Sequence, residues 1–145
     1  MNRRGRISFL GIVGLLCALV IVMVFAFSRE SLTTVGNRFM SALSHGDVDT
    51  LTEMTYLGNT PTEDIRKQWD FTCHTAGKYY NFRYRITSAV ANDERSGSVN
   101  MQVTKDAANP GSYEEVFQLP LIKVKDEWKV DVRGISREMY PALPR

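Results

Sequence analysis

An uninterrupted apolar segment near the N-terminus constrains this chain more than any other feature. No charged residue occurs from Ile7 to Ser28. These 22 residues would span about 33 Å as an α-helix, against a hydrocarbon core of about 30 Å in a bilayer. Three arginines precede the segment. Directly after it, Arg29 is offset by Glu30. Because positive residues favour the cytoplasmic side, the pattern predicts a cytoplasmic N-terminus over 1–6, a transmembrane signal anchor over 7–28, and a periplasmic or extracellular remainder.

A cleaved signal peptide is the alternative interpretation of this segment. Ala26 and Ser28 form a weak small-x-small cleavage pattern before Arg29. Signal peptides carry only about 7 to 15 apolar residues, so the length of the run favours an uncleaved anchor.

Small residues follow one stripe of the predicted anchor helix, at Gly11, Gly14 and Ala18. Small residues allow membrane helices to approach closely, so the stripe is a candidate helix-packing surface. Glycine and alanine are common in membrane spans in general, and an ordinary span is the favoured interpretation.

The net charge of the whole chain depends on its N-terminus. The chain has 18 Lys and Arg against 16 Asp and Glu, a net charge of +2. Without the three N-terminal arginines, 15 basic residues remain against 16 acidic ones, a net charge of −1. A nearly neutral exported part has no electrostatic footprint for nucleic acid, and we expect no nucleic-acid partner.

Apolar residues at helical spacing predict three helices after the anchor. Each predicted helix ends at a glycine, and capping residues precede the second and the third. The three helices are expected over about 31–44, 47–58 and 60–77, with Asp47 and Thr60 as N-caps and Gly46, Gly58 and Gly77 as terminators.

Beyond Gly77 the apolar period changes from helical to alternating, which predicts about four strands. Pro120 lies where the alternation of the third strand slips, so we expect a bulge or bend there. The residues predicted to face the core include Tyr80, Phe82, Tyr84, Ile86, Val99, Met101, Val103, Phe117, Leu119, Leu121, Trp128, Val130 and Val132.

These elements predict an α+β domain over 29–135, in which three helices pack on one face of a bent antiparallel sheet. Two prolines in the last ten residues indicate an irregular tail over 136–145.

Two short segments resemble the nuclear-transport-factor-2-like superfamily, in particular its small membrane-anchored or secreted bacterial members of unknown function. Val35–Asp47, VGNRFMSALSHGD, is similar to the opening helix of that group, and Glu127–Asp131, EWKVD, is similar to its last strand. The resemblance implies a cone-shaped domain with a pocket that different members use for catalysis, ligand binding or dimerisation. The inner-membrane scaffold subunit of type IV secretion channels has a similar layout, but this chain is shorter on both sides.

The inward-facing aromatic residues are the candidate lining of such a pocket. An aromatic lining could hold a small apolar ligand, with tyrosine hydroxyls as polar contacts; the favoured alternative is that these rings fill the core. No carboxylate falls in phase with them to act as a base, unless the third helix were rotated to turn Asp70 inward. The candidate lining consists of Trp69, Tyr80, Tyr84, Met101 and Trp128.

Neither cysteine indicates a disulfide or a metal site. Cys17 lies in the predicted anchor and Cys73 lies in the soluble part. Adjacent residues on a helix point about 100° apart, so Cys73 and His74 do not converge. We expect Cys73 on the apolar face with Ile65, Trp69 and Ala76, and His74 paired at the surface with Asp70. With His45 as the only other histidine, no zinc-type spacing exists, and no cofactor is expected.

One face of the predicted sheet carries several cations. Arg83, Arg85, Lys129 and Arg133 could form a docking surface, although Asp131 dilutes its charge. A solvated face of mixed charge is the default interpretation, with homodimerisation as the alternative.

The function predicted from these features is a membrane-tethered, non-enzymatic binding or scaffold domain of the bacterial cell envelope. No catalytic constellation is present in the sequence. One alternative is an assembly component of an envelope complex. A small isomerase or dehydratase-like enzyme is the third possibility, and it is the least favoured.

Overall fold

The protein is described by a computed structural model that covers residues 11, 13–21, 30–106 and 111–145. The chain divides into two units, Met1–Glu30 and Ser31–Arg145. In the first unit, residues 11 and 13–21 are helical and exposed. The predicted packing stripe of Gly11, Gly14 and Ala18 falls on them, and a Cβ added at either glycine would lie more than 4 Å from any described atom beyond its chain neighbours and its own helix backbone. Within the described residues no helix is both long and apolar enough to cross a membrane; the rest of the predicted anchor lies outside these residues.

The first two helices of the second unit follow their local signals. Helix α2 spans Leu32–His45, with Ser31 as N-cap and Gly46 as a left-handed C-cap at φ 68°. Helix α3 spans Val48–Met54, and the Asp47 side chain accepts a hydrogen bond from the backbone N–H of Thr50. The prediction that α3 continues to Gly58 was wrong, because the chain turns extended directly after Met54 and joins the sheet.

Helix α4 differs from its predicted form at both ends. It spans Thr62–Phe71, so its N-cap is Pro61 instead of Thr60. A π-helical segment, η1, continues it over Thr72–Ala76 and ends at Gly77, whose N–H donates to the Thr72 carbonyl oxygen at 2.8 Å. The wider i→i+5 turn changes the facing of the last residues. Ala76 is consequently exposed, whereas Cys73 stays buried as predicted.

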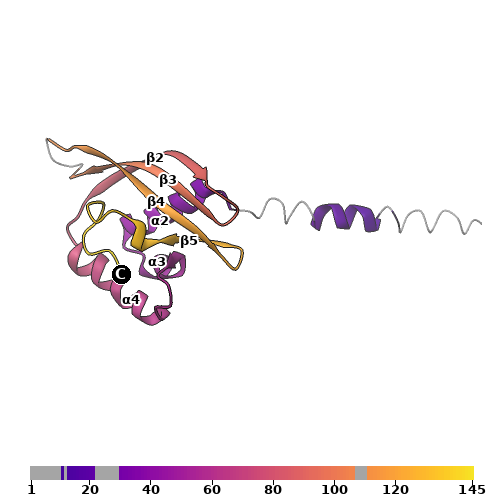
Figure 1. The fold of residues 1–145 in the computed structure, drawn as a ribbon, viewed down its shortest axis with the longest axis horizontal. Helices are drawn as coiled ribbons and strands as arrows, with labels where there is room; N and C mark the ends of the chain where they lie inside the picture. The colour runs from indigo at the N-terminus through magenta and orange to yellow at the C-terminus, as the bar shows by residue number, and fades with distance from the viewer. Residues whose placement is uncertain (1–10, 12, 22–29, 107–110) are drawn as a thin grey trace, which may run out of the picture. The chain divides into compact units, whose positions relative to one another are not determined.

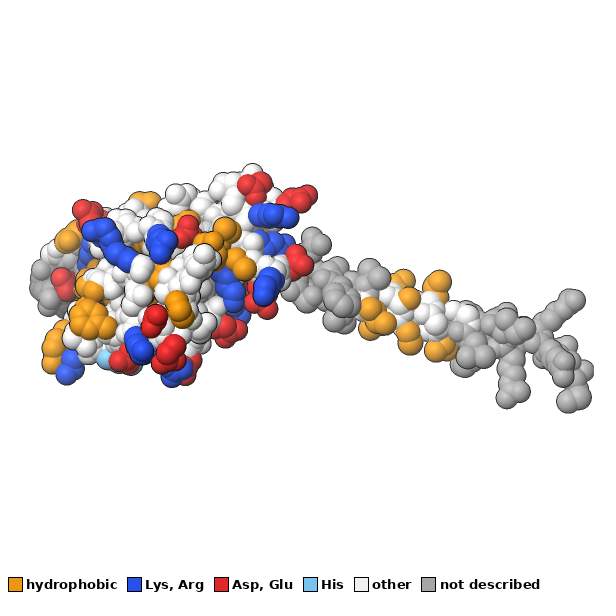
Figure 2. All heavy atoms as spheres, turned by 60° about the horizontal axis from the view of Figure 1, so that its bottom comes forward, with side chains coloured by type: hydrophobic (Ala, Val, Ile, Leu, Met, Phe, Trp, Pro, Cys, Tyr) orange, Lys and Arg blue, Asp and Glu red, His pale blue; other side chains and the backbone are white. Residues whose placement is uncertain are grey.

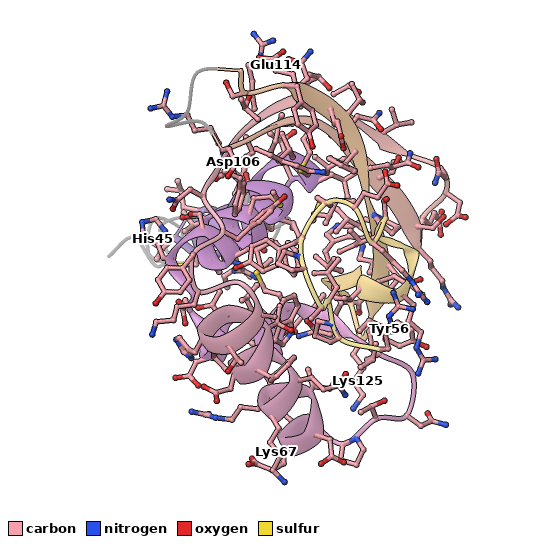
Figure 3. All side chains as sticks on the ribbon, turned by 90° about the vertical axis from the view of Figure 1, so that its left-hand side faces the viewer. His45, Tyr56, Lys67, Asp106, Glu114 and Lys125 are labelled. Atoms are coloured by element: carbon pink, nitrogen blue, oxygen red, sulfur yellow. The ribbon has the colours of Figure 1, made fainter. Side chains whose placement is uncertain are left out.

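The sheet has five strands in the order β1-β5-β4-β3-β2, not four antiparallel ones. The additional strand β1, Thr55–Tyr56, pairs in parallel with β5. Figure 3 shows Tyr56 beside the strand at this edge. The other four strands are antiparallel neighbours, and they span Phe82–Ala91 for β2, Ser96–Lys105 for β3, Glu114–Val124 for β4 and Glu127–Asp131 for β5.

The irregularity of the sheet lies in β2 and not at Pro120. The register between β2 and β3 shifts between Ile86 and Ser88, whereas β3 and β4 pair without a shift through Pro120. Pro120 stands one residue beyond the last β4–β5 pair, Leu121 with Val130. Proline is tolerated in a strand where a neighbouring ladder has ended, so no bulge is required.

The helices and the last residues of the chain close one side of the sheet (Figure 1). A short 3-10 helix, η2, spans Val132–Gly134, and the C-terminal tail, residues 136–145, then folds back as a series of turns. Although the tail contains no helix or strand, Met139, Tyr140 and Leu143 are buried in the same core as α2, α4 and the sheet.

Candidate functional site

The five residues of the predicted pocket lining lie in the core or at its rim. Trp69 and Met101 have no exposed surface. Tyr80, Tyr84 and Trp128 are half-buried and pack against the core. The best-defined depressions formed by the described residues are lined by other side chains.

The C-terminal tail occupies the space beside the predicted lining. The ring of Tyr140 packs edge-on against Tyr80, with centroids 5.0 Å apart, and against Phe82 at 5.8 Å. The Tyr80 hydroxyl donates to the Met139 carbonyl oxygen at 3.0 Å, and the Thr72 hydroxyl donates to the Ala142 carbonyl oxygen at 2.5 Å. At these positions the interior of the cone is packed with side chains.

Burial keeps the interior titratable groups in their neutral forms. Burial, followed by the negative charges of Asp70 and Asp47, raises the pKa of the Cys73 thiol to about 11. Burial likewise raises the pKa of Tyr140 to about 12. A thiol with such a raised pKa is not a thiolate nucleophile at neutral pH.

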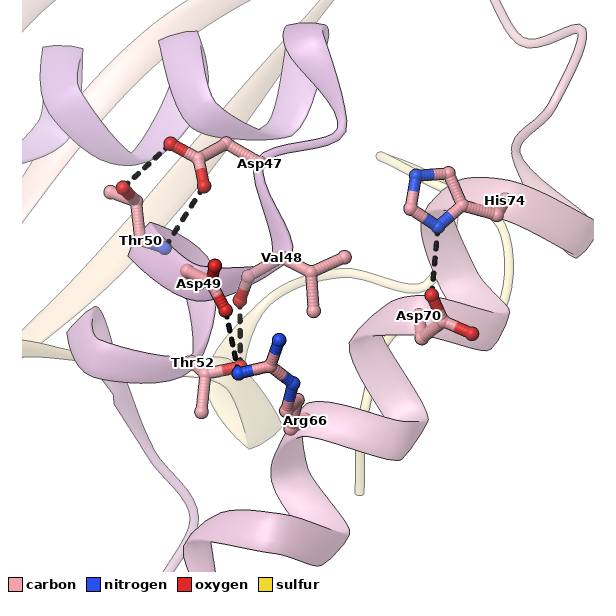
Figure 4. A network of polar contacts seen from close by, with 8 residues as sticks. All are labelled: Asp47, Val48, Asp49, Thr50, Thr52, Arg66, Asp70 and His74. Carbon is pink, nitrogen blue, oxygen red and sulfur yellow. Dashed lines mark hydrogen bonds and ion pairs between the residues drawn. The ribbon is translucent and has the colours of Figure 1, made fainter.

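A groove of 560 Å³ opens between α3 and α4 on the surface of the domain. Its residues come from the turn between α2 and α3, from the start of α3, from α4 and from η1. Figure 4 shows the polar contacts along it. We call it the α3–α4 groove; its lining is Gly46, Asp47, Val48, Asp49, Glu63, Arg66, Lys67, Asp70 and His74.

An ion pair and a histidine–carboxylate hydrogen bond run along this groove. Arg66 of α4 approaches the Asp49 carboxylate of α3 at 2.7 Å, and His74 Nδ1 lies 2.9 Å from the Asp70 carboxylate, the i,i+4 contact predicted from the sequence. More than half of each of these four side chains is exposed. In water such pairs contribute little to stability, so the groups remain available to a partner.

Asp47 has a structural role in the α3–α4 groove. Its carboxylate accepts hydrogen bonds from the Thr50 hydroxyl at 2.7 Å and from the Thr50 N–H at 3.1 Å. These bonds hold the pKa of Asp47 below its ordinary value, and the bond from the Thr50 hydroxyl has the largest effect. A carboxylate committed to capping a helix in its charged form is not a general base at neutral pH.

The groove exposes side chains of both charges. Lys67 pairs loosely with Asp64 at 3.8 Å, and the Glu63 side chain forms no hydrogen bond or ion pair with any other described residue. Among the described residues, no group of three or more His, Cys, Asp or Glu could hold a metal ion. Over the face with α4 turned forward, acidic and basic side chains are mixed (Figure 2).

One part of this groove could have been predicted from the sequence, namely a stripe of polar residues along α4 and η1. Five polar residues of α4 and η1 recur at spacings of three and four, opposite the buried Ile65 and Trp69. Such a stripe marks the exposed face of a helix. These residues are Glu63, Arg66, Lys67, Asp70 and His74.

The four cations considered from the sequence as a possible docking surface do not form one surface. Lys129 donates from Nζ to the Glu53 carbonyl oxygen at 2.7 Å, and Arg133 lies in η2 with its guanidinium beside Gly58. Only Arg83 and Arg85 remain together on exposed positions of β2.

No protein-family model matches the sequence, and no curated protein matches it. The fold is nevertheless shared with solved structures. An NTF2-like protein of unknown function from Shewanella oneidensis is 12% identical, with a TM-score of 0.50 over 68% of this chain and 90% of that chain. A SEC-C motif-containing protein from Rhodopseudomonas palustris is 13% identical, with a TM-score of 0.50 over 74% of this chain and 81% of that chain. The resemblance noted in the sequence is therefore confirmed at the level of fold, because the chain shares the fold of a solved nuclear-transport-factor-2-like protein.

Proposed function

We propose that this protein is a non-enzymatic binding module of the bacterial cell envelope, in which the α3–α4 groove receives a polar segment of a partner protein. The observation that carries the proposal is the filled interior, where Tyr140 and the tail occupy the space beside the predicted pocket lining. A ligand is then taken at the surface.

The charges of the groove favour a partner segment that carries both signs. Glu63 and Asp70 offer acceptors, while Arg66 and Lys67 offer donors, all on exposed positions of α4. Its volume of 560 Å³ is within the range of about 300 to 1,000 Å³ that small-ligand pockets occupy. A short peptide segment with alternating charges satisfies these groups.

Photocrosslinking in intact cells tests this site. A photoreactive amino acid in place of Glu63 is expected to give a defined crosslinked product, whereas the same group in place of the exposed Glu114 on β4 gives none. The charge reversal Arg66→Glu should abolish the product from position 63. Equal crosslinking from both positions, or a product indifferent to the reversal, contradicts the site.

We further propose that residues 7–28 tether the domain to a membrane, with the N-terminus cytoplasmic and the domain periplasmic or extracellular. The support is the uncharged run and the arginines before it. An impermeant thiol reagent applied to intact cells, or to cells with a permeabilised outer membrane, should label a cysteine placed at Glu114 but not one placed at Asn2. If the cysteines at both positions are labelled only after the cells are lysed, the proposed orientation is contradicted.

Catalysis would overturn the proposal of a binding module. A small molecule that co-purifies and is chemically altered, with turnover lost on changing Asp70 or Tyr84, identifies an enzyme instead.

A further inference from the structure

Three arginines that form no ion pair with another described residue line a second depression, formed by η2 and the C-terminal tail. This depression, the tail pocket, has a volume of 300 Å³. Arg133, Arg137 and Arg145 line it, over an apolar floor of Val132, Ile135 and Leu143. It shares no residue with the α3–α4 groove.

The fold brings the three arginines together by turning the tail back on the domain. Arg133 belongs to η2, directly after β5, and Arg137 follows it by one turn of chain. Arg145 is positioned by its backbone N–H, which donates to Gln68 Oε1 of α4 at 2.8 Å. The buried Leu143 anchors the chain between these points.

Within the described part of the chain, no Asp or Glu side chain lines the tail pocket. None of its arginine side chains forms an ion pair or hydrogen bond with another described residue. By contrast, Arg66 and Lys105 on other faces each pair with a carboxylate within 3.0 Å. Three cations around one small depression repel one another, and a multiply charged anion would relieve that repulsion.

We propose that the tail pocket binds a phosphate group, carried either by a small soluble phosphate ester or by a lipid headgroup. A phosphate monoester carries a charge of about −1.5 to −2 at pH 7. Its oxygens match the fork geometry of guanidinium groups, which donate in pairs. The apolar floor accommodates the carbon atoms next to the phosphate, and the pocket volume is at the low end for small ligands.

Titration of the full chain in detergent micelles tests the proposal. Inorganic phosphate and glycerol 3-phosphate are the soluble probes, and the arginine Nε–H resonances are the readout. Saturable shifts of the three pocket arginines are expected. Arg137→Gln should raise the dissociation constant by roughly tenfold or more, since a hydrogen bond to a charged group contributes about 1.5 to 3 kcal/mol. Arg137→Lys keeps the charge without the paired donors of the guanidinium, so its dissociation constant should lie between those of the wild type and Arg137→Gln.

Arg83→Gln is the matched control, because Arg83 is also exposed and forms no ion pair with a described residue. It should leave phosphate binding unchanged. The source of the phosphate is distinguished by repeating the measurement in nanodiscs of phosphatidylcholine with or without phosphatidic acid; saturation by the lipid alone assigns a headgroup, and saturation by glycerol 3-phosphate assigns a soluble ester.

Three results would overturn the proposal. These are the absence of saturable binding in both arms, an equal loss of binding in Arg83→Gln, and tighter binding of citrate than of either phosphate probe. Because the pocket arginines are exposed, their variants should fold normally, and unchanged thermal unfolding verifies this.

Discussion

The indole N–H of Trp69 donates a 2.8 Å hydrogen bond to the Thr55 hydroxyl, and that hydroxyl donates in turn to the Leu51 carbonyl oxygen at 2.7 Å. Both side chains are buried. This chain of hydrogen bonds connects α4 to α3 and to the start of β1. It therefore joins the two helices of the α3–α4 groove on their buried side.

Replacing Thr55 by valine should destabilise the domain by about 1 to 3 kcal/mol, because a buried indole N–H is left without an acceptor. Thr55→Ser keeps the acceptor and should cost less, although it removes a methyl group. Urea unfolding followed by near-UV circular dichroism measures both. A serine variant less stable than the valine variant would show that packing dominates at this position.

Tyr140→Ala should destabilise the domain by about 3 to 5 kcal/mol, the usual cost of removing a large aromatic side chain from a core. Tyr140→Phe keeps the ring contacts with Tyr80 and Phe82 and should be close to wild type. Thermal unfolding of the two variants separates the contribution of the ring from that of the hydroxyl. Similar losses in both variants would assign the stabilisation to the hydroxyl.

Gly77→Ala should also be destabilising, because a Cβ there would overlap the Tyr140 hydroxyl and lie 2.8 Å from the Thr72 carbonyl oxygen. Overpacking of this kind costs about 1 to 3 kcal/mol. Combined with Tyr140→Phe, the loss should be smaller, because the nearest clashing atom is gone. Additive losses in a double-mutant cycle would contradict this contact.

The domain should lose stability at alkaline pH. The pKa values of Cys73 and Tyr140 in the folded protein are raised to about 11 and about 12, from ordinary values of 9.0 and 10.0. Folding therefore favours the neutral forms, and their contribution is complete below pH 9 and is lost as the pH rises toward 12. Unfolding free energies measured from pH 8 to 12 should fall, and should fall less in Cys73→Ala. An identical slope in that variant would exclude the thiol as a source.

Exchanging Arg66 for glutamine should leave the unfolding temperature nearly unchanged, because the pair with Asp49 is exposed. The same variant should weaken crosslinking from position 63. A large drop in unfolding temperature would make the pair structural and remove it as a test of the α3–α4 groove.

The sequence predicted those parts of the fold that depend on near neighbours. Helix α2 starts and ends where the sequence predicts. Ser31, which was not predicted as a cap, caps it through contacts within three residues, and Gly46 ends it with a backbone conformation that glycine adopts easily. Asp47 caps α3 in the same local way. The one-residue shift at Pro61 remained because Thr60 and Pro61 carry competing start signals.

The parts of the fold that the sequence did not predict depend on contacts with residues far away in the chain. β1 has only two residues and no alternating pattern, and it becomes a strand because Thr55 pairs with Val130. Tyr140 is buried by Tyr80 and Phe82, which no pattern within the tail reveals. The α3–α4 groove combines three segments, so only its α4 stripe was visible in the sequence.

The dependence of the core on the end of the chain also determines the order of folding. Hydrogen bonds close loops of 70 residues between Thr72 and Ala142, and of 76 residues between Glu53 and Lys129. Closing long loops costs entropy before any contact repays it, so such contacts form late and slow the reaction. Helix formation and the β2–β3 hairpin can begin early, but the contacts of Tyr140 with Tyr80 and Phe82 form only after residue 140 has been synthesised. We therefore expect a nascent chain to remain incompletely folded until residues 139–143 have left the ribosome.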